Sequence, residues 1–220
     1  MALPLKSTLG EIRSAIQTRL GFGMAGQAGI VNSPLIDDFI RSAQIQLYDQ
    51  FDWDELKAVH ERTTGADQAY YDYPPDCNIE RITGIYVLYD GLNPRRLREG
   101  INATIRTNEI GRVPLFYERR DQIELYPVPE STIYTLRFEY IRTLLPLQVN
   151  SDRTSIDSEI VKLHALANAK AHYRQPDAQT YSTQLDAKLN RLKARHRSKT
   201  TWGRERRYDP YDYAPTDSVS

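Results

Sequence analysis

The chain has 220 residues, 40% hydrophobic and 26% charged, enough for one large domain or for a core with a smaller satellite. Its 29 basic and 29 acidic residues cancel, which argues against a general nucleic-acid-binding protein, and one cysteine excludes an intrachain disulfide and a cysteine-rich zinc site. The N-terminus has no signal-peptide pattern, and no apolar run approaches the roughly 20 residues that span a bilayer. We therefore expect a soluble protein made in a cytoplasm, without a membrane partner.

The first helix is predicted from its cap. Thr8 and Glu11 have the spacing of a capping box, and apolar residues follow at helical spacing, which predicts a helix over 8–20. The next segment, 21–29, holds four glycines, but it follows a helix and no Gly-Lys-Ser/Thr closes it. We therefore predict a flexible connection between helices rather than a phosphate-binding loop.

A second helix is predicted over 34–50. Ser33 has the chemistry of a helix cap, and Pro34 suits the first helical position because its missing amide would be unpaired there anyway. Phe51 and Trp53 follow the apolar stripe of this helix. They are expected to close its end as a hydrophobic plug.

The middle of the chain predicts strands. Nine of the 15 tyrosines lie between Tyr70 and Tyr140, and tyrosine favours both strands and protein contact surfaces. Residues 115–145 contain three segments of period-two alternation, which predicts an antiparallel meander with one apolar and aromatic face. The members of that face on the last strand are Tyr134, Leu136, Phe138 and Tyr140.

The segments before the meander are less uniform. Residues 79–89 predict a strand that ends in a turn at Asp90-Gly91. Residues 55–64 fit a strand or a helix and favour the strand, because Val59, Thr63 and Thr64 are β-branched. Residues 92–108 fit either a short helix or an irregular arm.

The C-terminal part predicts two helices and an arm. Asp157 or Ser158 caps the first helix, and a Pro-containing turn at 174–177 separates it from the second. Residues 186–207 then hold nine Lys or Arg against two Asp or Glu, a distribution that suits a helix C-terminus. Residues 200–220 have no apolar period and are not expected to fold alone, yet they carry four aromatic residues. Such an arm is either an inert tail or a segment that becomes ordered on a partner, and the aromatics favour the second.

No catalytic constellation is present. The four histidines are scattered, none is in a His-Glu-x-x-His pattern, and Cys77 has no neighbouring base in the sequence. There is also no Gly-x-Ser-x-Gly nucleophile elbow. We therefore expect no enzyme, no metal site and no cofactor.

Four short sequence patterns follow one another in a particular order along the chain. They are Leu47-Tyr48-Asp49-Gln50-Phe51-Asp52-Trp53 after the second helix, Tyr71-Asp72-Tyr73-Pro74-Pro75-Asp76, Pro114-Leu115-Phe116-Tyr117, and the run from Ile123 to Pro129. Together with two closing helices and a loose tail, this layout over most of residues 8–200 resembles the head-to-tail adaptor, or connector, proteins of short-tailed bacteriophages. The connection 92–113 does not match that layout.

The resemblance implies a structural virion protein at the head-tail junction, assembled in the host cytoplasm. It implies a ring of about 12 subunits below the portal protein, joined to a tail tube or nozzle protein, with genomic double-stranded DNA passing through the channel without sequence-specific contacts. The C-terminal arm would then dock on the portal. Its candidate portal-binding residues are Trp202, Arg204, Arg206, Arg207, Tyr208, Tyr211 and Tyr213.

The expected fold class is α+β. A helical bundle of two N-terminal and two C-terminal helices would carry an inserted antiparallel β-meander or sandwich and an extended C-terminal arm. The expected divisions are residues 1–53, 54–148, 149–199 and 200–220. The alternative function is a nucleic-acid-binding module that uses the basic C-terminal helix and the aromatic tail.

Overall fold

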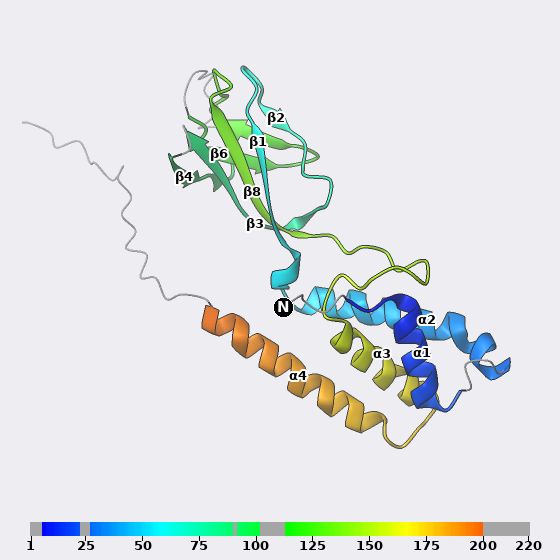
Figure 1. The fold of residues 1–220 in the computed structure, drawn as a ribbon. Helices are drawn as coiled ribbons and strands as arrows, with labels where there is room; N and C mark the ends of the chain where they lie inside the picture. The colour runs from blue at the N-terminus through cyan, green and yellow to red at the C-terminus, as the bar shows by residue number, and fades with distance from the viewer. Residues whose placement is uncertain (1–5, 23–26, 90–91, 102–112, 200–220) are drawn as a thin grey trace, which may run out of the picture.

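The computed structural model describes residues 6–22, 27–89, 92–101 and 113–199 (Figure 1). Within these ranges it has four α-helices, one short 3₁₀ helix and eight strands, and the strands form two four-stranded sheets. The expected mixed α+β class is confirmed. In Figure 1 the sheets lie together above the helices, and the chain enters them after α2 and leaves them before α3.

Helix α1 (Leu9–Leu20) begins where the sequence predicts it. The Thr8 hydroxyl accepts a hydrogen bond from the Glu11 amide at 3.2 Å, and the Glu11 carboxylate accepts one from the Thr8 amide at 2.8 Å. This capping box satisfies two amides that a helix start leaves unpaired. The helix ends at Gly21, whose φ of 82° is in the left-handed region that glycine adopts without strain.

Helix α2 (Gln27–Gln50) begins earlier than predicted, and Pro34 lies inside it. The prediction that Ser33 caps the helix is wrong, because the Ser33 hydroxyl instead accepts a hydrogen bond from Gln17 Nε2 of α1 at 3.0 Å. An interior proline costs a helix about 3 kcal/mol. Burial of the following turns offsets that cost, since Ile36 and Ile40 are fully buried. The predicted connection 21–29 is therefore shorter than expected; residues 23–26 lie outside the described ranges.

The first sheet has the strand order β1, β8, β3, β4, and all its pairs are antiparallel. Its strands are β1 (Lys57–Thr63), which follows the 3₁₀ helix Asp54–Leu56, β3 (Cys77–Tyr89), β4 (Leu92–Arg96) and β8 (Tyr134–Arg142). The strand favoured at 55–64 and the strand predicted at 79–89 are confirmed. The turn predicted at Asp90-Gly91 lies outside the described residues.

The second sheet has the order β2, β7, β6, β5, and its β5–β6 pair is parallel. Its strands are β2 (Tyr70–Tyr71), β5 (Arg98–Glu99), β6 (Phe116–Arg119) and β7 (Ile123–Tyr126). The meander predicted over 115–145 is only partly right: β6 pairs with β7, but β8 belongs to the first sheet between β1 and β3. The residues between β7 and β8 allow the chain to change sheets, and β8 then gains two strand partners where a meander would give it one.

The two sheets share one core. The predicted apolar face of β8 is confirmed, with Leu136 and Phe138 fully buried, and it packs in the same cluster as Ile123 and Leu125 of β7. Side chains of a strand alternate between its two faces. Each sheet buries one face against the other sheet, and the polar residues lie on the opposite face. The arrangement is a small sandwich.

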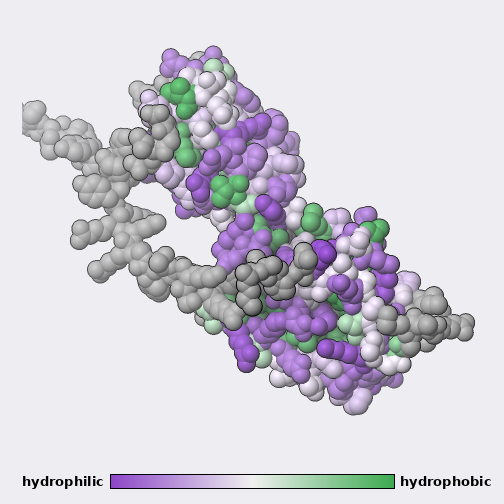
Figure 2. All heavy atoms as spheres, viewed as in Figure 1, coloured by the Kyte–Doolittle hydropathy of each residue, from purple (hydrophilic) through white to green (hydrophobic). Residues whose placement is uncertain are grey.

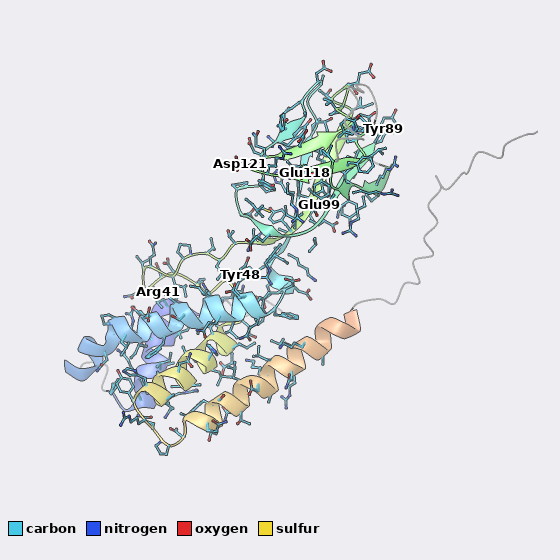
Figure 3. The ribbon with its side chains drawn as sticks, turned by 180° about the vertical axis from the view of Figure 1, so that it is seen from behind. Arg41, Tyr48, Tyr89, Glu99, Glu118 and Asp121 are labelled. Carbon is cyan, nitrogen blue, oxygen red and sulfur yellow. The ribbon has the colours of Figure 1, made fainter. Side chains whose placement is uncertain are left out.

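The helices have a separate core. Helix α3 (Ser158–His172) begins at Asp157, whose carboxylate accepts hydrogen bonds from the amides of Glu159 and Ile160, which confirms one of the two predicted caps. It packs on α1, on α2 and on α4 (Ala178–Lys199), and apolar residues of all four helices belong to one cluster. Figure 1 and Figure 3 both draw α3 between α2 and α4.

Candidate assembly interface

The predicted portal-binding residues all lie within 200–220, outside the described residues, so their role stays a prediction. They are Trp202, Arg204, Arg206, Arg207, Tyr208, Tyr211 and Tyr213. The described residues offer other candidate features at the junction between helices and sheets, in the connection 143–156, at the tip of the sandwich and on α4.

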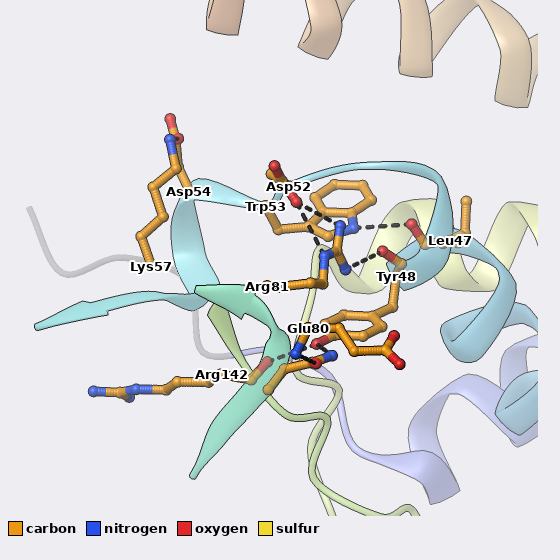
Figure 4. A network of polar contacts seen from close by, with 10 residues as sticks. Leu47, Tyr48, Asp52, Trp53, Asp54, Lys57, Glu80, Arg81 and Arg142 are labelled. Atoms are coloured by element: carbon orange, nitrogen blue, oxygen red, sulfur yellow. Dashed lines mark hydrogen bonds and ion pairs between the residues drawn. The ribbon is translucent and has the colours of Figure 1, made fainter. Parts of the chain in front are cut away.

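The junction is held by Arg81 of β3 (Figure 4). Its guanidinium donates to the Tyr48 carbonyl at 2.8 Å and to Asp52 Oδ1 at 2.6 Å, and it lies 4.6 Å from the centroid of the Tyr48 ring. A planar guanidinium can make these bonds and the cation–π contact together. One side chain of the first sheet thus fastens the C-terminal end of α2.

The Tyr48 hydroxyl makes a second connection at the same place. It donates to the carbonyl of Arg142, at the end of β8, at 3.1 Å and accepts from Asn78 Nδ2 of β3 at 2.7 Å. Trp53 is buried beside it, with its Nε1 donating to the Leu47 carbonyl at 2.9 Å and its ring edge-to-face with Phe51. The predicted hydrophobic plug is confirmed, and these contacts restrict the angle between helices and sheets.

The connection 143–156 is held against the helices by side chains of α2. Arg41 donates to the Leu147 carbonyl at 2.7 Å, and Gln44 bridges the connection by donating to the Leu145 carbonyl and accepting from the Ser155 amide. Figure 3 shows Arg41 and Tyr48 on α2 beside this connection. A loop whose carbonyls are bonded to a helix keeps one shape, which favours its use as a contact surface.

Asp152 fixes the outer part of the same connection. Its Oδ2 accepts hydrogen bonds from the amides of Gln148 and Val149 at 2.6 and 2.8 Å, while its carbonyl accepts from the Leu9 amide at 2.8 Å. The two amide bonds stabilise the charged carboxylate and lower the pKa of Asp152. The run Leu144-Leu145-Pro146-Leu147 is the sequence signal that could have indicated an apolar contact surface here.

Three exposed apolar side chains lie on α2 and on the connection 143–156. Leu145 is 68% exposed and Val149 is 57% exposed, and Ile45 of α2, next to Gln44, is 54% exposed. Figure 2 shows hydrophilic residues over most of the visible surface, with hydrophobic ones in small separate groups. Three such side chains on a fixed backbone suit a small contact with another protein.

A second exposed apolar group lies at the end of the sheets far from the helices, where Figure 3 labels Tyr89. The rings of Tyr89 and Tyr134 are 5.6 Å apart, and Tyr89 and Ile133 are both 54% exposed. Tyrosine covers a large area at a small cost in side-chain entropy. The tip of the sandwich is thus another candidate contact surface.

The outer face of α4 is basic. Arg191 and Lys193 are exposed, and Lys188 Nζ lies 3.7 Å from Oδ1 of Asp157, the residue that caps α3, so one of these cations is paired within the chain. Of the predicted cluster 186–207, the structure describes side chains only up to residue 194. The described cations therefore lie on the outer part of α4.

The outer side of the second sheet carries a fixed ion pair. Arg119 Nε and Nη2 donate to the two Glu99 oxygens at 2.5 and 2.6 Å, and Figure 3 labels Glu99 on the sandwich. Hydrogen bonding from Arg119 lowers the pKa of Glu99. Both side chains stay partly exposed. The ion pair joins β5 to β6 at the edge of the sheet, because Glu99 belongs to β5 and Arg119 to β6.

Cys77 is buried and His164 is half-buried. Burial raises the pKa of the Cys77 thiol to about 11, so the thiol is protonated at neutral pH, and burial lowers the pKa of His164. Within the described ranges, no three His, Cys, Asp or Glu side chains are grouped as metal ligands would be.

None of the described helices combines the length and the apolar character that a bilayer span needs. In a comparison with curated proteins, no match was found. A comparison with protein families matches the model described as "SU10 adaptor protein" over residues 7–208, nearly the whole chain and all four helices and both sheets described above. The resemblance to phage head-to-tail adaptors is thereby confirmed, and the chain belongs to the SU10 adaptor protein family.

Proposed function

We propose that this protein is a structural subunit of a phage particle that forms a ring below the portal and joins it to the tail. The observation that carries the proposal is the family match over residues 7–208, because it covers the helices, the sandwich and the basic end of α4 together. The partners are the portal protein, a tail tube or nozzle protein, and further copies of this chain in a ring of about 12 subunits. Genomic DNA passes through the channel without being read.

The C-terminal segment 200–220 supplies the portal contact in this proposal. Its aromatic and arginine residues are the types that dominate protein interfaces, and its lack of an apolar period leaves them free of a core of their own. Ordering such a segment costs conformational entropy, which only a complementary groove offsets. Attachment therefore depends on the portal, and simultaneous contacts around a ring turn modest single affinities into durable binding.

The proposal extends to the division of the chain. The divisions 1–53, 54–148, 149–199 and 200–220 separate a helical part that holds the ring from a β-rich part directed at neighbours or the tail. The existence of one core for the helices and another for the sheets supports this division. The protein acts by binding rather than by catalysis, in the virion and during assembly in the host cytoplasm.

Removal of residues 200–220 tests the portal contact. We expect the shortened chain to fold and to lose at least about tenfold in binding to isolated portal rings, measured by sedimentation. A variant with Trp202, Tyr208, Tyr211 and Tyr213 changed to alanine should show the same loss, while Thr216→Ala with Ser218→Ala should bind as the parent chain does. Full binding by the shortened chain contradicts the proposal. Tight binding of the intact protein to DNA with a steep salt dependence would favour the nucleic-acid alternative.

A further inference from the structure

Two outer faces of the helical part differ in shape and in charge. On α2, Asp38, Ile45 and Asp49 are exposed and are spaced so that they share one side of the helix, opposite the buried Ile36 and Leu47. Leu145 and Val149 are exposed on the connection that Arg41 and Gln44 of α2 hold. We call these five residues the α2 patch.

The α4 face is the exposed side of the last helix. Ala187, Arg191 and Ala194 are exposed and share one side of α4, opposite the buried Leu185 and Leu189. The described side chains of α4 include three cations, Lys188, Arg191 and Lys193, against one carboxylate, Asp186. The α4 face therefore has short side chains at Ala187 and Ala194. It is basic because Arg191 lies between these alanines, with Lys188 and Lys193 on the same helix.

The two faces lie on opposite sides of the helical part. Helices α2 and α4 both pack on α3, and Figures 1 and 3 draw α3 between them. The α2 patch projects large apolar side chains flanked by carboxylates, whereas the α4 face has small side chains and cations. Each face thus carries the shape and the charge that the other lacks.

We propose that the α2 patch of one copy of this chain binds the α4 face of the next copy in the ring. This inference rests on the proposed function, since it names the lateral contact of the same assembly. Two different surfaces on opposite sides make a head-to-tail contact, and repetition of such a contact generates a ring when its rotation closes. A contact between identical patches would stop at a dimer.

The strength of this contact fits assembly on a template. A stable interface buries about 800 Å² on each partner, and three exposed apolar side chains with a few ion pairs form only part of that. A single contact is therefore weak in solution. When portal-bound subunits are held side by side, their effective concentration is in the millimolar range and the same contact becomes occupied.

Charge reversal and its rescue test the proposal with the full chain and portal rings. Asp38→Lys with Asp49→Lys places cations against cations, and Arg191→Glu with Lys193→Glu places carboxylates against carboxylates. At the subunit concentration that half-saturates portal rings with the parent chain, we expect each pair of changes to lower ring occupancy about tenfold, counted by electron microscopy. The chain with all four changes should regain most of the occupancy, because every contact is again complementary.

Apolar substitutions provide the matched control. Ile45→Lys should reduce occupancy, while Val59→Lys on β1, a residue of nearly the same exposure (53% against 54%), should not. The inference is overturned if the charge-reversed chains assemble as the parent does, or if the fourfold change fails to rescue them. Failure of the parent chain itself to bind portal rings contradicts the proposed function instead, so the two failures are distinguishable.

Discussion

The guanidinium of Arg13 forms a paired contact with the carboxylate of Asp37, with Nε to Oδ1 at 2.5 Å and Nη2 to Oδ2 at 2.6 Å. The two side chains are only 19% and 12% exposed, so this ion pair between α1 and α2 lies largely out of solvent. A half-buried charge that loses its partner is left with an uncompensated desolvation cost. The pair therefore restricts how α1 sits on α2.

Arg13→Ala should lower the free energy of unfolding by about 1 to 3 kcal/mol, because it leaves the Asp37 carboxylate without its partner. Urea titration followed by circular dichroism measures the change. The control is Lys57→Ala, which breaks an exposed pair with Asp54 and should cost less than about 0.5 kcal/mol. Equal effects of the two variants would show that burial of the Arg13 pair contributes nothing.

Tyr48→Phe should lower the free energy of unfolding by about 1 to 2 kcal/mol, since the Arg142 carbonyl and Asn78 Nδ2 both lose their partner. The ring stays under Arg81, so the effect is confined to the hydroxyl. Hydrogen exchange measured on peptides at the start of β3 and the end of β8 should become faster. Unchanged exchange there, with unchanged stability, contradicts a role of the hydroxyl in joining helices to sheets.

Asp152→Ala should loosen the connection 143–156 without unfolding the protein, because the amides of Gln148 and Val149 lose their acceptor to water. Faster hydrogen exchange in this segment is the expected result, with an unfolding midpoint close to that of the parent chain. If the α2 patch forms the lateral contact, ring occupancy on portals should also fall, since a mobile loop pays ordering entropy on binding. Asp152→Asn, which keeps one acceptor oxygen, should retain part of the protection.

Cys77 provides a pH-dependent prediction. Burial raises the pKa of its thiol to about 11, against about 8.5 in an unfolded chain. Folding therefore favours the protonated thiol, and this contribution to stability is fully present below about pH 8.5 and is lost as the pH rises toward 11.

Iodoacetamide modification measures the state of this thiol. At pH 8.5 the folded protein should react far more slowly than the urea-unfolded protein, because the buried thiol is both protonated and covered. Cys77 is the single cysteine, so mass spectrometry reads the reaction without ambiguity. Equal rates in the folded and the unfolded protein would contradict the burial.

Local chemistry predicts some elements well. The Thr8–Glu11 capping box and the Asp157 cap are confirmed because each depends on residues within three positions of one another. The alternation of Leu136 and Phe138 is confirmed for the same reason, since a pleated strand imposes it locally.

Contacts between distant residues explain what the sequence did not show. Pro34 predicts a helix start because proline favours the first helical position, but α2 begins at Gln27 and the Ser33 hydroxyl bonds to Gln17 of α1 instead. The sheet to which β8 belongs depends on pairing with β1 and β3, which no local pattern encodes. The fixed shape of 143–156 depends on Arg41 and Gln44, about 100 positions away in the chain.

The pairing of Lys57 with Ile141 means that the chain leaves the helices and returns to them at neighbouring positions. The residues between these two form an insertion that joins the helical part through a single pair of adjacent strands. The hydrogen bond from Arg81 to Asp52 stabilises this connection. Lengthening or shortening the insertion would alter the distance between its tip and the helices and leave the helical core intact. A protein built in this way can be fitted to particles of different dimensions by changes in one continuous stretch of sequence.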